Sequence, residues 1–145
     1  MREIAMLVTN KNFPLITVFG HGADVLFPQE YGWEIHKQYP GLIRRMVHTH
    51  PAGAAFLSEE DRTTLKAWTM AFAPHFIAME VLCPNGKHLF RKMWWYQMMT
   101  LEEWLKTDRS KPREMKLMES DLSGQKNPDW VHDIIKFSEY DAHSI

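Results

Sequence analysis

Apolar residues form two short runs near the start of the chain. Residues 4 to 8 make the first run, residues 14 to 19 make the second, and the polar segment Thr9-Asn-Lys-Asn separates them. Two short apolar runs on either side of a polar turn are typical of a β-hairpin. The sequence therefore predicts that the chain opens with two antiparallel strands.

The next segment has helical spacing. Between Pro28 and a proline-glycine stop, large residues recur every four positions, at Tyr31, Ile35 and Tyr39. This spacing predicts a helix over that stretch in spite of Gly32. The segment from Leu42 to His50 then ends before a proline, which has no N–H to donate within a sheet, so a strand is predicted there.

A longer helix is predicted between Ser58 and Pro74. Its apolar residues fall on one face, at Leu65, Trp68 and Phe72. Residues 76–82 and 87–93 follow as strand candidates around Pro84-Asn-Gly, which is a strong turn signal. A second hairpin is therefore predicted after this helix.

The last part of the chain carries weaker patterns. Beyond Trp94 the sequence is amphipathic and predicts a helix through Lys106, whereas residues 107–127 are rich in charged and small residues and predict a mobile linker. Residues 128–138 again have helical spacing. We therefore expect a domain over residues 1–106 and a C-terminal extension over residues 107–145, partly flexible and with a short helix.

Composition limits the classes of protein to consider. The 145 residues are 45% apolar, enough for one hydrophobic core, and the formal net charge of −1 disfavours binding to nucleic acid. The only cysteine, Cys83, cannot form an internal disulfide, which favours a reducing compartment. The apolar run after Met1 is too short for a signal peptide or a membrane span. We expect a cytoplasmic protein that binds neither membrane nor nucleic acid.

The motif that indicates chemistry lies between the predicted strand and the longer helix. It consists of His48-Thr-His50-Pro, six further residues, and Ser58-Glu-Glu-Asp61. Side chains two positions apart on a strand point to the same side, so both histidines can reach one metal ion. Asp61, in the first turn of the helix, can return to the strand end as a third ligand. Two histidines and one carboxylate leave a fourth position open for water, as in catalytic zinc sites.

Each part of this motif has a simpler explanation on its own. Ser58 and Asp61 also match the capping box of a helix. A pair such as His48 and His50 on a strand end is more often a hydrogen-bonded surface feature than a pair of ligands. The joint spacing of all these residues favours the metal site, and Ser58 can cap the helix and serve the site together.

At these residues the sequence resembles the JAB/MPN domains that carry the JAMM motif. The family pattern is His-x-His-Pro, six residues and Ser-x-x-Asp, with a glutamate upstream. The resemblance implies an α/β fold with a mixed, cytidine-deaminase-like β-sheet sandwiched by helices. It implies zinc ligands at His48, His50 and Asp61, and a hydrogen bond from Ser58 that stabilises the tetrahedral intermediate.

The resemblance also requires a glutamate that acts as general base and then as general acid. Three glutamates precede the motif, at Glu3, Glu30 and Glu34. Glu3 is the preferred candidate because the family's glutamate opens a short apolar strand that leads a hairpin. The other two fall on the first predicted helix.

The function that this resemblance implies is hydrolysis by one Zn²⁺ per chain. Family members cleave peptide or isopeptide bonds, so the expected partner is a polypeptide, with the C-terminal tail of a ubiquitin-like protein as the expected substrate. The short chain is most similar to compact prokaryotic or phage members. The alternative is a non-catalytic MPN scaffold that serves only in protein assembly.

Overall fold

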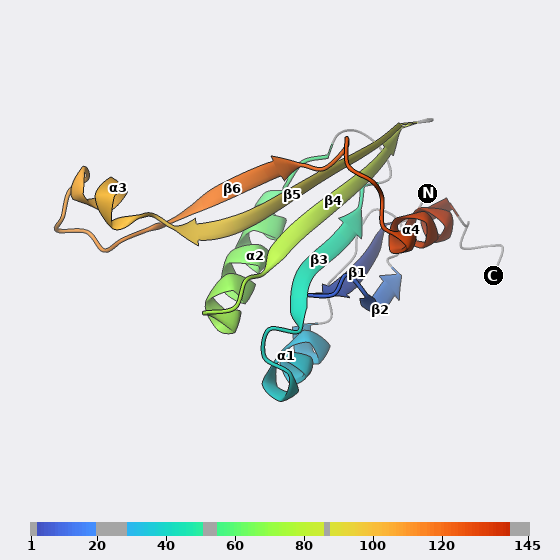
Figure 1. Ribbon diagram of the computed structural model, residues 1–145, viewed down its shortest axis with the longest axis horizontal. Coiled ribbons are helices and arrows are strands. Elements are labelled where there is room, and N and C mark those ends of the chain that lie inside the picture. The colour runs from blue at the N-terminus through green and yellow to red at the C-terminus, as the bar shows by residue number, and fades with distance from the viewer. Residues whose placement is uncertain (1–2, 20–28, 51–54, 86–87, 140–145) are drawn as a thin grey trace.

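A six-stranded mixed sheet forms the centre of the molecule in the computed structural model, which describes residues 3–19, 29–50, 55–85 and 88–139. The strands are β1 (Ile4–Thr9), β2 (Pro14–Phe19), β3 (Ile43–Thr49), β4 (Ala78–Asn85), β5 (His88–Met98) and β6 (Met115–Asp121). Their order across the sheet is β2-β1-β3-β4-β5-β6, as Figure 1 shows. Only β3 and β4 run parallel, and the other neighbours pair antiparallel.

Four helices accompany the sheet in the described ranges. They are α1 (Gln29–Gln38), α2 (Glu59–Phe72), α3 (Leu101–Leu105) and α4 (Asp129–Glu139). The mixed α/β class expected from the sequence is therefore confirmed. Within these ranges, no helix is both long enough and apolar enough to cross a membrane.

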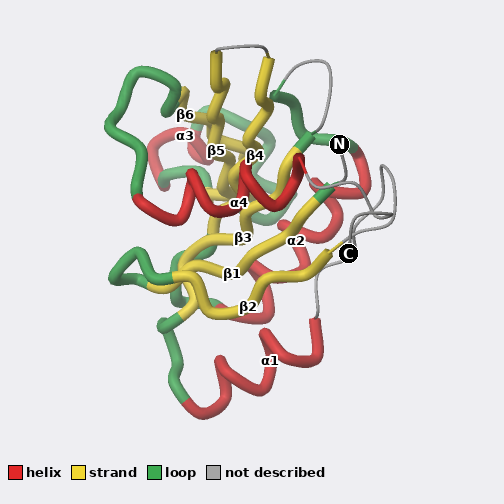
Figure 2. The backbone as a smooth tube through the Cα atoms, turned by 90° about the vertical axis from the view of Figure 1, so that its right-hand side faces the viewer, coloured by secondary structure: helices red, strands yellow, loops and turns green. Residues whose placement is uncertain are grey.

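Two hydrophobic cores lie on opposite faces of the sheet. Between the sheet and α2 the buried residues are Leu7, Ile43, Met46, Leu57, Leu65, Trp68, Phe72, Ile77, Met79, Val81 and Trp94. Between the sheet and α4 they are Ile4, Met6, Val8, Val47, Leu82, Trp130, Val131 and Ile134. Figure 2 shows the strands seen from the side of α4, with α1 below them. Helices thus cover both faces of the central strands.

The sandwiched position explains the sequence of β1. All six of its residues are buried, because β2 and β3 flank it and a core lies on each face. A strand buried on both faces has a continuous apolar run in place of the alternation of a half-exposed strand. Glu3, which directly precedes this run, is therefore attached to one of the most enclosed strands of the fold.

Most of the predicted elements are confirmed. The opening hairpin, the helix before Pro40, the strand that carries the motif, the helix opened by Ser58 and the C-terminal helix all form within a few residues of the expected limits. The two strands predicted after α2 also form and pair antiparallel, but β5 continues to Met98.

The region after Trp94 differs from its prediction. The helix expected through Lys106 is wrong, because β5 runs on to Met98 and only α3 is helical. The linker predicted over residues 107–127 contains β6, which pairs with β5, for example Trp95 with Met118. Together β5 and β6 extend beyond the rest of the sheet and carry α3 at their far end (Figure 1). A domain boundary at residue 106 stays a prediction.

The attachment of α4 can be tested at Trp130. This side chain is 3% exposed, and its indole N–H donates to Asn12 Oδ1 at 2.8 Å. We expect Trp130→Ala to lower the free energy of unfolding by about 3 to 5 kcal/mol, because it leaves a large cavity in the core. Denaturant unfolding measures this loss. Trp130→Phe keeps most of the packing and should cost about 1 kcal/mol; equal losses in both variants would contradict the packing role.

A second test concerns the contact between α1 and α2 at Gly32. A Cβ added at this buried residue would overlap the Trp68 ring, with Cζ3 at 2.8 Å. Alanine favours a helix over glycine by about 1 kcal/mol, but overpacking costs about 1 to 3 kcal/mol. We therefore expect Gly32→Ala to lower the melting temperature. A higher melting temperature would show that α1 and α2 can move apart to accept the added methyl group without loss of stability.

Candidate metal centre

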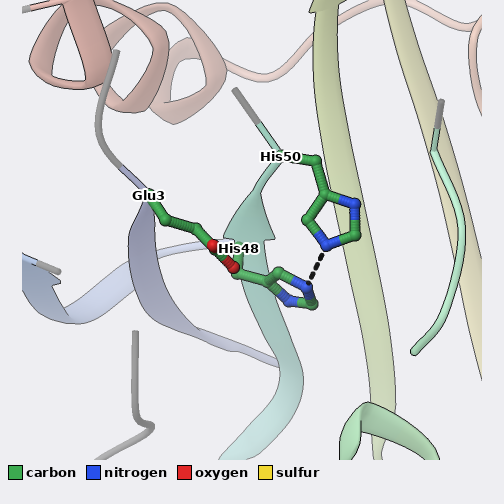
Figure 3. Close-up of side chains that lie close together, drawn as sticks. All are labelled: Glu3, His48 and His50. Atoms are coloured by element: carbon green, nitrogen blue, oxygen red, sulfur yellow. Dashed lines mark hydrogen bonds between the residues drawn. The ribbon is translucent and has the colours of Figure 1, made fainter. Parts of the chain in front are cut away.

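The two histidines of the motif lie at the carboxyl end of β3, beside the parallel strand β4. His48 is buried at 1% exposure. The backbone N–H of His50 donates to the backbone carbonyl of Leu82 at 2.8 Å. Their Nε2 atoms are 3.0 Å apart (Figure 3). The predicted arrangement on one side of the strand is thus present, and both rings direct the same type of nitrogen toward a common point.

The N-terminus of α2 brings Asp61 into contact with His48, while the described group that could hold a metal ion consists of Glu3, His48 and His50. Ser58 is the N-cap: its Oγ accepts from the N–H of Asp61 at 3.1 Å, and its own N–H donates to Asp61 Oδ2 at 3.2 Å. The same Oδ2 lies 3.3 Å from His48 Nε2. The capping box and the contact with His48 therefore coexist, and the cap fixes the carboxylate against the end of β3.

The electrostatics of Asp61 favour its charged form. Burial by itself raises the pKa of this carboxyl. The hydrogen bond and charge of His48 and the hydrogen bonds of Ser58 lower the pKa by more than burial raises it, so the pKa lies below its usual value. The group is therefore an ionised carboxylate at neutral pH. A partly buried negative charge beside the His48 imidazole is the kind of donor that suits a divalent cation.

Glu3 completes the group from the neighbouring strand. Pairing of Ala5 with His48 brings the start of β1 alongside the end of β3. One ligand atom of each of Glu3, His48 and His50 lies within 4.8 Å of the others, and Figure 3 shows the Glu3 side chain directed toward His48. The other candidate bases, Glu30 and Glu34, are exposed on α1, outside this cluster.

The spacing of these atoms fits a zinc ion. Tetrahedral ligands at about 2.0 to 2.1 Å from zinc are about 3.3 Å from one another, and the separations found are 3.0 Å between the two imidazoles and 3.3 Å from His48 to Asp61. Asp61 approaches the same nitrogen of His48 that faces His50. A carboxylate that only orients a ligand would approach the other nitrogen, so the contact of Asp61 with His48 Nε2 is compatible with the expected ligand role.

Phe56 also borders the centre, although no pattern in the sequence predicts it. Its ring centroid is 4.8 Å from that of His50, and the side chain is 54% exposed. Because Phe56 lies in an irregular segment before α2, no periodicity relates it to the histidines. It packs against the His50 ring and presents an apolar surface beside the centre.

Comparisons with known proteins add no assignment: no protein-family model matches the chain, and no curated protein is similar to it. The metal centre is therefore inferred from its own geometry and from the spacing of the motif.

Zinc content tests this centre directly. After extensive dialysis we expect about one zinc per chain in the wild type and none in the His48→Ala/His50→Ala double variant, by elemental analysis. A His88→Ala/His132→Ala variant is the matched control, because both histidines are exposed and lie on β5 and α4. Equal zinc in all three proteins, or no zinc in the wild type after zinc is added back, would refute the metal centre.

Proposed function

We propose that this chain is a zinc-dependent hydrolase of the JAMM type that cleaves peptide or isopeptide bonds. The single observation that carries the proposal is the cluster of Glu3, His48 and His50, with Asp61 Oδ2 3.3 Å from the His48 Nε2 that also faces His50. Three protein ligands with an open fourth position are typical of catalytic zinc, whereas structural sites are usually closed by four.

The proposed chemistry divides between the ion and the side chains. Zinc supplies a Lewis acid that makes water a better nucleophile near neutral pH and polarises a carbonyl group. His48, His50 and Asp61 would hold it, and the cap at Ser58 keeps the Asp61 carboxylate in place. These residues therefore position the ion without a large rearrangement of the backbone.

Glu3 is the proposed proton carrier. A carboxylate close to the attacking water can take its proton as the oxygen adds to the amide carbon. The same group can then return that proton to the nitrogen of the leaving amine, which cannot depart as an anion. The location of Glu3 within 4.8 Å of the imidazole nitrogens supports this role.

Ser58 is the proposed donor to the oxygen of the substrate carbonyl. Its Oγ already accepts from the N–H of Asp61. A hydroxyl that accepts through a lone pair still has its hydrogen to donate, and donors aimed at a developing oxyanion can stabilise a transition state strongly. Capping the helix and assisting the reaction are therefore compatible roles for this residue.

The proposed fold and substrate follow the family resemblance. The mixed sheet with helices on both faces is compatible with an MPN domain, in which the strand and helix of the motif are β3 and α2. The proposed substrate is the C-terminal tail of a ubiquitin-like protein. A scaffold without activity is the competing function, and a zinc-loaded protein that cleaves no such tail would favour it.

The proposed base can be tested with Glu3→Gln. Glutamine has nearly the same shape but cannot accept a proton, so we expect kcat to fall by roughly 10² to 10⁴-fold, with zinc content unchanged. The assay is cleavage of a linear fusion of ubiquitin to a peptide, followed by mass spectrometry.

Glu30→Gln is the matched control for this variant, since Glu30 is exposed on α1. It should retain the wild-type rate. If Glu3→Gln cleaved as fast as the wild type while His48→Ala was inactive, the proton carrier would be another residue although the metal centre stood.

A further inference from the structure

The backbone pairing between β1 and β3 ends at the metal centre. Its last residue pair is Ala5 with His48, whereas β3 continues to pair with β4 through Thr49 and Leu82. Glu3 lies two residues beyond the last pair on β1. On its other side Ile4 pairs with Phe19 of β2, so a link from this end of β1 to β3 has to come from a contact beyond the paired residues of β1 and β3.

Thr49 provides that contact. It is fully buried at 0% exposure, and its Oγ1 accepts a hydrogen bond from the N–H of Ile4 at 2.9 Å. Side chains alternate along a strand, so Thr49 points away from the side that His48 and His50 share. Thr49, which lies between the two histidines in the sequence, thus bonds to the backbone N–H of Ile4, the residue next to Glu3.

From this geometry we infer that Thr49 is a positioning residue, which holds the start of β1 so that the Glu3 carboxylate stays beside the metal centre. The inference rests on the proposed function, because it takes Glu3 as the proton carrier. The hydroxyl of Thr49 accepts from the N–H of Ile4 and extends the link between β1 and β3 by one residue beyond the Ala5–His48 pair. Thr49 touches neither the ion nor the substrate and acts through Glu3.

The chemistry of threonine suits this role. Two heavy substituents on Cβ restrict χ1, so the hydroxyl is held in one direction. Valine has nearly the same shape but no acceptor, and it would leave the N–H of Ile4 without its bond. Serine keeps the acceptor and loses only a methyl group. The pair Thr49→Val and Thr49→Ser therefore separates the hydrogen bond from the packing.

The first measurement is the kinetics of the zinc-loaded full chain on the linear ubiquitin fusion. We expect Thr49→Val to lower kcat roughly 10- to 100-fold, since small displacements of a reacting group have effects of this size. KM and zinc content should not change, and Thr49→Ser should restore most of the rate. In the Glu3→Gln background, Thr49→Val should have no further effect.

Thr9→Val is the matched control at the other end of β1. Thr9 is also buried, and its Oγ1 accepts from the N–H groups of Lys11 and Phe13 at 3.2 and 3.1 Å. We expect this variant to lose stability but to keep kcat. An equal fall of kcat in both threonine variants, or an undiminished effect of Thr49→Val in the Glu3→Gln background, would overturn the inference.

A second readout does not depend on activity. Backbone ¹⁵N relaxation should give the Glu3 amide an order parameter of about 0.85 in the wild type and in Thr49→Ser, and below about 0.6 in Thr49→Val. If Glu3 loses order in Thr49→Val but the wild type cleaves nothing, the positioning role stands and the hydrolase proposal fails. If Glu3 stays ordered in Thr49→Val, the positioning role fails whatever the activity.

Discussion

The centre depends on one shared oxygen atom, Oδ2 of Asp61. This atom accepts from the N–H of Ser58 and lies 3.3 Å from His48 Nε2, so it joins the first turn of α2 to the end of β3. A helix N-terminus favours negative charge because its N–H groups lack partners within the helix. The cap therefore stabilises α2 and the carboxylate together. Without this link, α2 and β3 could each form, but Asp61 would not be held against His48.

A buried ion-pair network supports the sheet on the face opposite α2. Glu80 of β4 is fully buried and bonds to Arg91 Nε at 3.1 Å and to Arg45 Nη1 at 2.8 Å. Arg91 also donates to Asn127 Oδ1, in the segment that leads into α4. A buried charge is tolerated only when its partners are in place, so this network requires β3, β4, β5 and the start of α4 to be assembled. The strands that carry the centre are thereby held in register from their other face.

The sequence allowed prediction of those parts of the fold whose pattern reflects their burial. The unbroken apolar run of β1 and the one-sided face of α2 follow from two cores that enclose them. The edge strand β6 was missed because its residues are at most partly buried, and its place is fixed by pairing with β5. The site shows the same division. His48, His50 and Asp61 share one local motif, whereas Glu3 is chosen among three glutamates only through the family resemblance, and its place beside the histidines comes from pairing between distant strands. The contacts of Thr49 and Phe56 have no sequence pattern.

The placement of Glu3 directly before β1 determines how firmly the proposed proton carrier is held. A proton carrier is effective only if the backbone that carries it is held in place, because small displacements of a reacting group are costly. Here the strand that follows Glu3 is buried along its whole length, and Thr49 and Thr9 accept hydrogen bonds at its two ends. The carboxylate is therefore carried by the hydrophobic core and not by a loop. Sites supported by regular elements are held more accurately than sites on loops, and this fold places His48 on β3, Asp61 on α2 and Glu3 at the start of β1, with His50 directly after β3. Preorganisation of the centre thus follows from the same burial that stabilises the sheet.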